Sequence, residues 1–230
     1  MPVIARTAVL LTAAAALIIP AATAQASPAG NPAPAPRAGE RLTQPLQVAL
    51  KSLTIADEDR SGYQRSSFKH WVDADKDGCT TRAEVLKAEA LSAPDQGPRC
   101  KLTGGRWYSE YDDQYVEGPA KLDIDHRIPL AEAWDSGAKH WSTAERQAYA
   151  NDLGDTRALI AVTATSNRSK SDQDPSTWMP PADGNRCKYV SQWIAVKTRW
   201  KLTIDPSEEA ALAENTTRCP NTPIAVQLAR

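Results

Sequence analysis

The stretch Lys121-Leu-Asp-Ile-Asp-His-Arg-Ile-Pro-Leu130 decides the fold. Apolar and polar side chains alternate from Leu122 to Ile124 and on to His126, a pattern typical of a strand that Pro129 brings to an end. Neighbouring side chains on a strand point to opposite faces. The pattern therefore places the carboxylate of Asp125 and the imidazole of His126 side by side in the chain but on opposite faces of the strand.

Outward from this strand, the sequence predicts a second strand and several helices. The run 158–163 (ALIAVT) is typical of a strand and leads directly into 165–172 (TSNRSKSD). Between the two strands, 130–138 (LAEAWDSGA) and 143–153 (TAERQAYANDL) have helical patterns, and Ser142 or Thr143 can cap the second of them. Short strands among longer helices predict a mixed α+β domain.

The first residues are typical of an export signal. Arg6 supplies a positive charge, residues 7–19 are apolar, and residues 24–26 (AQA) form a small-x-small cleavage site. The alternative is a membrane anchor, but this apolar run is short for a span of about 20 residues. Residues 27–40 are rich in Pro and Ala and predict a disordered tether. We therefore expect a signal peptide at 1–26, a linker at 27–40, one domain at 41–230, and a secreted, extracellular protein.

Four cysteines in an exported chain indicate two disulfides. Residues 185–201 carry apolar side chains at spacings of three and four, which predicts a helix, and a second helix should begin after Asp205 with Pro206 in its first position. If these helices form an antiparallel hairpin, Cys187 lies beside Cys219, and Cys79–Cys100 follows by exclusion. The rival is a zinc site made of cysteines, but no C-x-x-C spacing supports it.

The ends of the two predicted strands carry a pair of motifs. Asp125-His126-x-x-Pro129 is followed downstream by Asn167-Arg-x-Lys-x-Asp172. This order resembles the HNH, or ββα-metal, endonucleases, in particular the HNH domains of CRISPR-associated nucleases, of modification-dependent restriction enzymes and of secreted actinobacterial proteins. The resemblance extends from about Arg65 to Cys219. It implies an HNH ββα-metal core with a small antiparallel hairpin, embedded in a mostly helical, disulfide-containing domain.

The resemblance also implies a role for each matching residue. His126 would deprotonate the attacking water, and Asp125 and Asn167 would hold a divalent cation, Mg²⁺ or Mn²⁺, on the scissile phosphate. A cation that stabilises the leaving oxygen implies 5′-phosphate ends. The other matching residues fall into two groups: Arg127, Arg168 and Lys170 as substrate contacts, and Asp123, Glu132 and Asp172 as supports of the site.

The chemistry of these residue types agrees with such roles. An imidazole with a reference pKa of about 6.5 accepts a proton near neutral pH, and oxygen ligands suit a hard cation such as magnesium. The formal net charge of −1 argues against tight, stoichiometric nucleic-acid binding, but a catalyst needs only a local cationic cleft. The sequence departs from the fullest HNH pattern where Ala158 occupies the place of the middle Asn. Asn151 is a distant substitute.

A second candidate metal site lies upstream, at 73–84. Asp73, Asp75, Asp77 and Glu84 occupy positions one, three, five and twelve of an EF-hand loop pattern, which implies a structural Ca²⁺. Thr80 replaces the usual aliphatic residue at position eight. The alternative is a polar turn in which Thr80 or Thr81 caps the following helix.

Plainer roles exist for the same residues. His126 can be a strand-end histidine with a satisfied hydrogen bond, Asn167 can be a helix cap, and His70 and His140 suit surface or packing positions. We nonetheless predict a secreted, metal-dependent endonuclease that hydrolyses DNA, with RNA as an open second substrate and little sequence specificity. We expect neither a membrane nor an obligate protein partner. Two alternatives stay open: a calcium-dependent extracellular binding protein with an inactive nuclease-like motif, and a phosphoesterase for small substrates.

Overall fold

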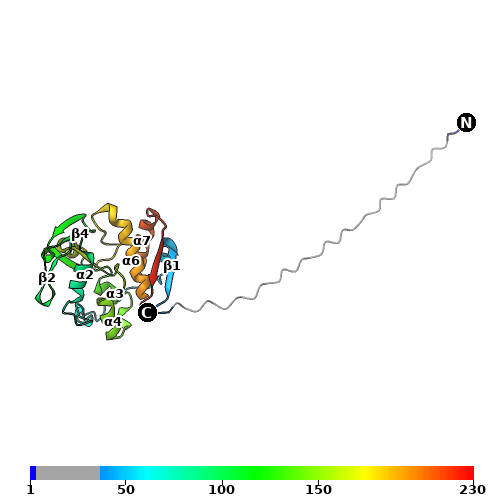
Figure 1. Cartoon of the computed structure of the whole chain (residues 1–230). Coiled ribbons are helices and arrows are strands. Elements are labelled where there is room, and N and C mark those ends of the chain that lie inside the picture. Colours follow the sequence, from blue (N-terminus) through cyan, green and yellow to red (C-terminus); the bar gives the residue numbers. More distant parts are fainter. Residues whose placement is uncertain (4–36) are drawn as a thin grey trace. The chain divides into compact units, whose positions relative to one another are not determined.

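The structure, a computed structural model, describes residues 1–3 and 37–230 (Figure 1). The chain divides into the units 1–35 and 36–230, and every element below belongs to the second. The predicted signal peptide beyond residue 3, and the predicted linker up to residue 36, lie outside the described residues. Gly39 and Glu40 pair with Leu228 through backbone hydrogen bonds of 2.8 Å. The folded unit therefore begins slightly before its predicted start at Arg41.

Helices and short strands alternate along the described chain. The helices are α1 (Leu46–Lys51), α2 (Thr81–Glu89), α3 (Leu130–Asp135), α4 (Thr143–Ala150), α5 (Ala164–Lys170), α6 (Arg186–Trp200) and α7 (Pro206–Thr217). The strands are β1 (Arg41–Pro45), β2 (Asp95–Gly97), β3 (Lys101–Thr103), β4 (Arg106–Ser109), β5 (Gln114–Glu117), β6 (Leu122–His126), β7 (Leu159–Thr163) and β8 (Pro223–Gln227). This confirms a mixed α+β fold. Among the described residues, no helix is long and apolar enough to span a bilayer.

The strands form small antiparallel pairs: β1 with β8, β2 with β3, β4 with β5, and β6 with β7. The two strands predicted from the sequence are confirmed as β6 and β7, and His126 lies opposite Leu159 in their register. Helix α5 follows β7 directly, at the end of the pair where β6 begins, and it packs back along β6. This packing brings the two predicted motifs together.

The β6–β7 pair contributes to two separate hydrophobic clusters. Ile124 and Ala161 pack with Trp107 of β4 and with side chains of α2. Ile160 and Val162, which alternate with Ala161, belong to the larger cluster around α6. Burying an apolar side chain of this size stabilises the fold by about 1.5–3 kcal/mol. Because both faces are buried, a register shift would be costly, and the strand ends that carry the motifs are fixed in place.

Helices α6 and α7 lie side by side near β1 (Figure 1). The carboxylate of Asp205 accepts hydrogen bonds from the first turn of α7, and Pro206 is its first residue, as predicted. The disulfides Cys187–Cys219 and Cys79–Cys100 are both present, which confirms the predicted pairing. The first joins the beginning of α6 to the end of α7. Helix α4 begins with a capping box of Ser142 and Glu145.

A buried ammonium group joins α3, α6 and α7. The Nζ atom of Lys197 lies 2.6 Å from Oε1 of Glu132 and 3.0 Å from Oε2 of Glu208, and it also donates to the Thr203 carbonyl and to Ser136. Glu132 was expected to support the strand that carries the predicted site. Its hydrogen bonds with Lys197 and Ser136 instead help to hold the three helices together, because it lies on the face of α3 that meets α6.

We expect Lys197→Ala to lower the free energy of unfolding by about 3–5 kcal/mol, because Glu132 and Glu208 would stay buried without their cation. Urea denaturation followed by tryptophan fluorescence measures this change. The control is Lys51→Ala on the exposed side of α1, expected to change stability by less than about 0.5 kcal/mol. A loss below about 1 kcal/mol for Lys197→Ala would contradict the role of this ion-pair cluster.

Candidate functional site

The end of β6 and the middle of α5 line a common cavity of about 290 Å³. All three residues predicted to be catalytic, Asp125, His126 and Asn167, line it. The lining residues are Arg65, Ile124, Asp125, His126, Pro129, Leu130, Asn167, Arg168, Ser171 and Asp172.

His126 is held by the last residue of α4. Its Nε2 atom lies 2.9 Å from the carbonyl oxygen of Ala150. A carbonyl oxygen can only accept, so Nε2 carries the proton of the neutral ring when this bond is made. The other ring nitrogen, Nδ1, is then the atom that can accept a proton from a reactant.

Aromatic rings surround the His126 imidazole. Trp71 stacks on it with ring centroids 5.5 Å apart, and Tyr149 lies at 6.3 Å. Burial lowers the pKa of His126 to about 4, because the charged ring loses its hydration; the bond with Ala150 and the charge of Asp125 act in the opposite direction. The imidazole is therefore neutral at neutral pH, the form that a general base requires.

Asp125 leaves the strand on the other face and meets different partners. The Tyr111 hydroxyl donates to its Oδ2 atom at 2.6 Å, and Lys170 Nζ lies 2.8 Å from the same carboxylate oxygen. Lys170 was expected to contact substrate. The structure instead buries it completely, and it also donates to the His126 carbonyl at 3.0 Å. Burial lowers the pKa of Lys170, while its pairing with Asp125 acts the other way.

Asn167 lies inside α5 and does not cap it. The cap is Thr163, whose hydroxyl oxygen accepts from the Ser166 backbone N–H. The Asn167 amide nitrogen donates to Oδ2 of Asp123 at 3.2 Å. This bond fixes the orientation of the amide and leaves its carbonyl oxygen available as a ligand. Asp123 therefore holds the amide of Asn167, and its role as a support of a catalytic site stays a prediction.

Arg127, like Lys170, was expected to contact substrate, and the structure buries it as well. Its side chain is completely buried, with Nη2 2.6 Å from Oε1 of Glu110 and Nη1 3.1 Å from the Tyr111 hydroxyl. It also donates to Gln192 on α6. Because its side chain is enclosed in the core, Arg127 fixes the Tyr111 hydroxyl and does not reach a phosphate in solution.

The rim of the cavity carries cations and one exposed acid. Arg168 is exposed, and its Nε atom lies 3.9 Å from Oδ2 of Asp123. The exposed acid is Asp172, whose Oδ2 atom lies 3.9 Å from Nη1 of Arg60. Arg65 also lines the cavity, although nothing in the sequence motifs singled it out. It belongs to the segment before the acidic loop, and only the folded chain shows that this segment reaches the site.

Asn151 anchors the segment that carries Trp71. Its side-chain oxygen accepts from the Val72 N–H and the Thr81 hydroxyl, and its nitrogen donates to the carbonyls of Lys69 and Gln147. Trp71 has a φ of 58°, a left-handed conformation that is costly for a bulky residue. These bonds hold the indole against His126 despite that cost. Asn151 thereby fixes a loop beside the site, while Ala158 is an apolar residue of the core.

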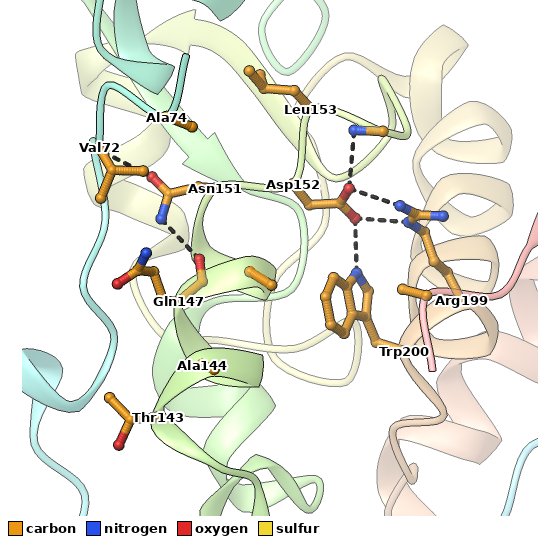
Figure 2. Close-up of a pocket in the computed structure, with 13 residues that line it drawn as sticks. Val72, Ala74, Thr143, Ala144, Gln147, Asn151, Asp152, Leu153, Arg199 and Trp200 are labelled. Carbon is orange, nitrogen blue, oxygen red and sulfur yellow. Dashed lines mark hydrogen bonds and ion pairs between the residues drawn. The ribbon is translucent and has the colours of Figure 1, made fainter. Parts of the chain in front are cut away.

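The next residue, Asp152, ties the same segment to α6. Figure 2 shows its carboxylate facing Arg199 and Trp200, which donate to it at 2.7–2.8 Å. These residues line a larger cavity of about 750 Å³, whose charged groups bind each other. Asn151 therefore ties the chain after Ala150 to the segment that carries Trp71, and Asp152 ties it to α6. These contacts fix the Ala150 carbonyl that orients His126.

The predicted calcium loop is assembled in part. Asp73, Asp75 and Asp77 each offer an oxygen within 4.8 Å of the others. The carboxylate of Glu84 lies instead beside the sulfur atoms of Cys79 and Cys100. Its Oε1 atom lies 3.1 Å from Lys87 Nζ. Its position on α2 therefore does not complete the ligand set expected from the sequence. Thr80 occupies the N-cap position before α2 but forms no side-chain cap bond.

We expect the His126 ring to titrate near pH 4 in a histidine NMR titration, assigned with His126→Gln. The folded-state pKa lies below the unfolded value of about 6.5. The stability that His126 contributes is therefore present above pH 6.5 and is lost as the pH falls toward about 4. Wild type should lose more stability over this window than His126→Gln. Titration of His126 near pH 6.5 would contradict the desolvated environment.

Comparison with known proteins gives two matches. The family model described as GmrSD restriction endonucleases, C-terminal domain, matches residues 81–215, a range that includes β6, β7 and α5. An uncharacterized secreted protein of Arthroderma benhamiae is 37% identical over 203 residues, which cover 88% of this chain and 97% of that protein. No solved structure matches the chain.

Proposed function

The chain belongs to the family of the C-terminal domain of GmrSD restriction endonucleases, and we propose that it is a secreted, metal-dependent endonuclease of the HNH type. The family supports a nuclease-like function. The observation that carries the finer proposal is the cavity at the end of β6, where a neutral imidazole with an available Nδ1 stands beside Asp125 and Asn167.

In this proposal His126 takes the proton of the attacking water. Its Nε2–H bond to Ala150 keeps Nδ1 unprotonated, and the ring that forms on proton transfer is stabilised by the charge of Asp125. The ring planes of Trp71 and Tyr149 prevent the imidazole from turning away. A positioned base of this kind contributes about 10²–10⁴-fold to a rate.

The residues present fit a hard divalent cation. Asp125 offers a carboxylate and Asn167 an amide oxygen, and both line the same cavity. A carboxylate has about four lone-pair positions, so Tyr111 and Lys170 do not exhaust those of Asp125. Magnesium or manganese bound there would neutralise charge on the scissile phosphate and the leaving oxygen. Lys170 already offsets the charge of Asp125, which favours a weakly held ion.

The substrate we propose is a nucleic-acid backbone, with DNA as the main polymer and RNA as the second. Arg65 and Arg168 line the cavity and are exposed, so they can meet phosphate oxygens. Among the described residues, the cavity presents no set of base-reading side chains, which agrees with little sequence specificity. A cation on the leaving oxygen would give 5′-phosphate products. Two disulfides and a relative described as secreted support an extracellular location.

Purified residues 27–230 should nick and then degrade supercoiled plasmid when magnesium or manganese is present, and not in excess chelator. His126→Ala should reduce the rate by at least about 100-fold, because the water loses its base. The matched control is His140→Ala, an exposed histidine of the same chain, which should cut like wild type.

The outcomes separate the proposal from its alternatives. Equal cutting by wild type and His126→Ala would show that His126 is not the base. No cutting with any metal would favour a calcium-dependent binding protein. Preferential hydrolysis of a small aryl phosphate ester over plasmid would favour a phosphoesterase instead.

We also propose that Asp73, Asp75 and Asp77 bind a structural Ca²⁺. A ligand that binds only the folded state stabilises it by about 2.7 kcal/mol at a hundredfold excess over Kd. Calcium should therefore raise the Tm of wild type relative to chelator, and Asp75→Asn/Asp77→Asn should abolish the increase. Asp57→Asn, an exposed acid outside the loop, is the control. An unchanged wild-type Tm would exclude a structural ion here.

A further inference from the structure

A second hollow lies directly beside the candidate active site. It is a groove of about 620 Å³ between β5, the residues before β6 and the first turns of α5. Arg168 lines both this groove and the cavity that holds Asp125 and His126. A polymer whose phosphate lies in the cavity would therefore continue into the groove without leaving the protein surface.

An exposed aromatic ring stands in this groove. Tyr115 is 59% exposed, although large apolar side chains of the fold are mostly buried. The ring is nevertheless held: Tyr108, its partner in the β4–β5 register, lies 5.3 Å away, and the Arg106 guanidinium lies 4.4 Å from its centroid. An exposed aromatic ring that is fixed in place loses little side-chain entropy when a flat ligand stacks on it.

Tyr108, the aromatic neighbour of Tyr115, is itself fixed by hydrogen bonds. Its hydroxyl donates to Asp113 at 2.9 Å and accepts from the Asn185 side-chain nitrogen at 2.9 Å. Asn185 also donates to the Glu110 carbonyl. The hairpin that presents Tyr115 is therefore attached to the beginning of α6 and does not move independently of the site.

The groove also carries positive charge that the fold does not use. Lys121 is exposed and lines it, and among the described residues it forms no ion pair. The exposed Arg168 lies at the boundary with the active-site cavity. The acid that lines the groove, Glu117, is offset by Arg106 at 3.2 Å. Cations beside an exposed aromatic ring are the combination that binds unpaired nucleotides.

We propose that this groove binds the single-stranded nucleotides that flank the scissile phosphate, with a base on Tyr115 and backbone phosphates on Lys121 and Arg168. The inference rests on the proposed nuclease function and adds a substrate class to it. A base exposes its ring face only when it is unpaired, so the groove selects single strands, or frayed duplex ends, over intact duplex.

The test uses the His126→Ala protein, which holds substrate without cutting it, and a fluorescein-labelled thymidine 12-mer followed by anisotropy. Adding Tyr115→Ala should weaken binding about tenfold, whereas Tyr115→Phe, which keeps the ring, should change it by less than about twofold. Adding Lys121→Ala should weaken binding and reduce the slope of log K against log salt by about 0.7. Lys51→Ala in the same background should have no effect.

The preference for single strands is measured by comparing this binding with that of a blunt hairpin duplex of similar length. The His126→Ala protein should bind the single strand more tightly than the duplex, and Tyr115→Ala should remove most of that difference. Equal binding of both ligands, or a preference that survives Tyr115→Ala in a folded protein, would overturn the proposal. Failure of the proposed function is recognised separately, because wild type would then leave both the plasmid and the single-stranded 12-mer intact with every metal, while the binding differences could still be measured.

Discussion

Asp125 and His126 are consecutive residues on a strand, so their side chains leave the backbone on opposite faces, and this constraint organises the region around them. Each face must satisfy its own polar group. On one face, Tyr111 and Lys170 bind the carboxylate. On the other, the Ala150 carbonyl and the Trp71 ring hold the imidazole. Elements far apart in the sequence are thereby fixed relative to two neighbouring residues.

The buried cations around the strand follow from the same constraint. An ionised side chain in a core is stable only when it is paired, and Lys170 and Arg127 each have a carboxylate partner. Arg127 follows His126 directly and binds Glu110 and Tyr111, so it fixes the hydroxyl that binds Asp125. Residues that resemble substrate contacts in the sequence are therefore part of the framework, and the cations left for a phosphate are those on the rim.

The sequence predicts the local structure here better than the roles of its charged residues. Strand alternation predicts β6, and capping residues predict the beginnings of α4 and α7, because each depends on neighbours in the chain. The expected antiparallel hairpin of α6 and α7 predicts Cys187–Cys219, and Cys79–Cys100 then follows by exclusion. Burial depends on the whole fold. The pattern Asn-Arg-x-Lys cannot show that Arg168 is exposed while Lys170, two residues later, is buried. Nor can it show that Trp71 and Arg65 reach the site, because a separate segment brings them there.

The two neighbouring polar groups at the end of β6 are held in different environments. A buried carboxylate is stable in a core only when other groups bind it. For Asp125 these are the ammonium group of Lys170 at 2.8 Å and the Tyr111 hydroxyl, which fixes its orientation. His126 has the opposite environment, because its own burial favours the neutral ring. A carboxylate paired with a cation, beside an imidazole that burial keeps neutral, is the combination on which the proposed cation binding and proton abstraction depend.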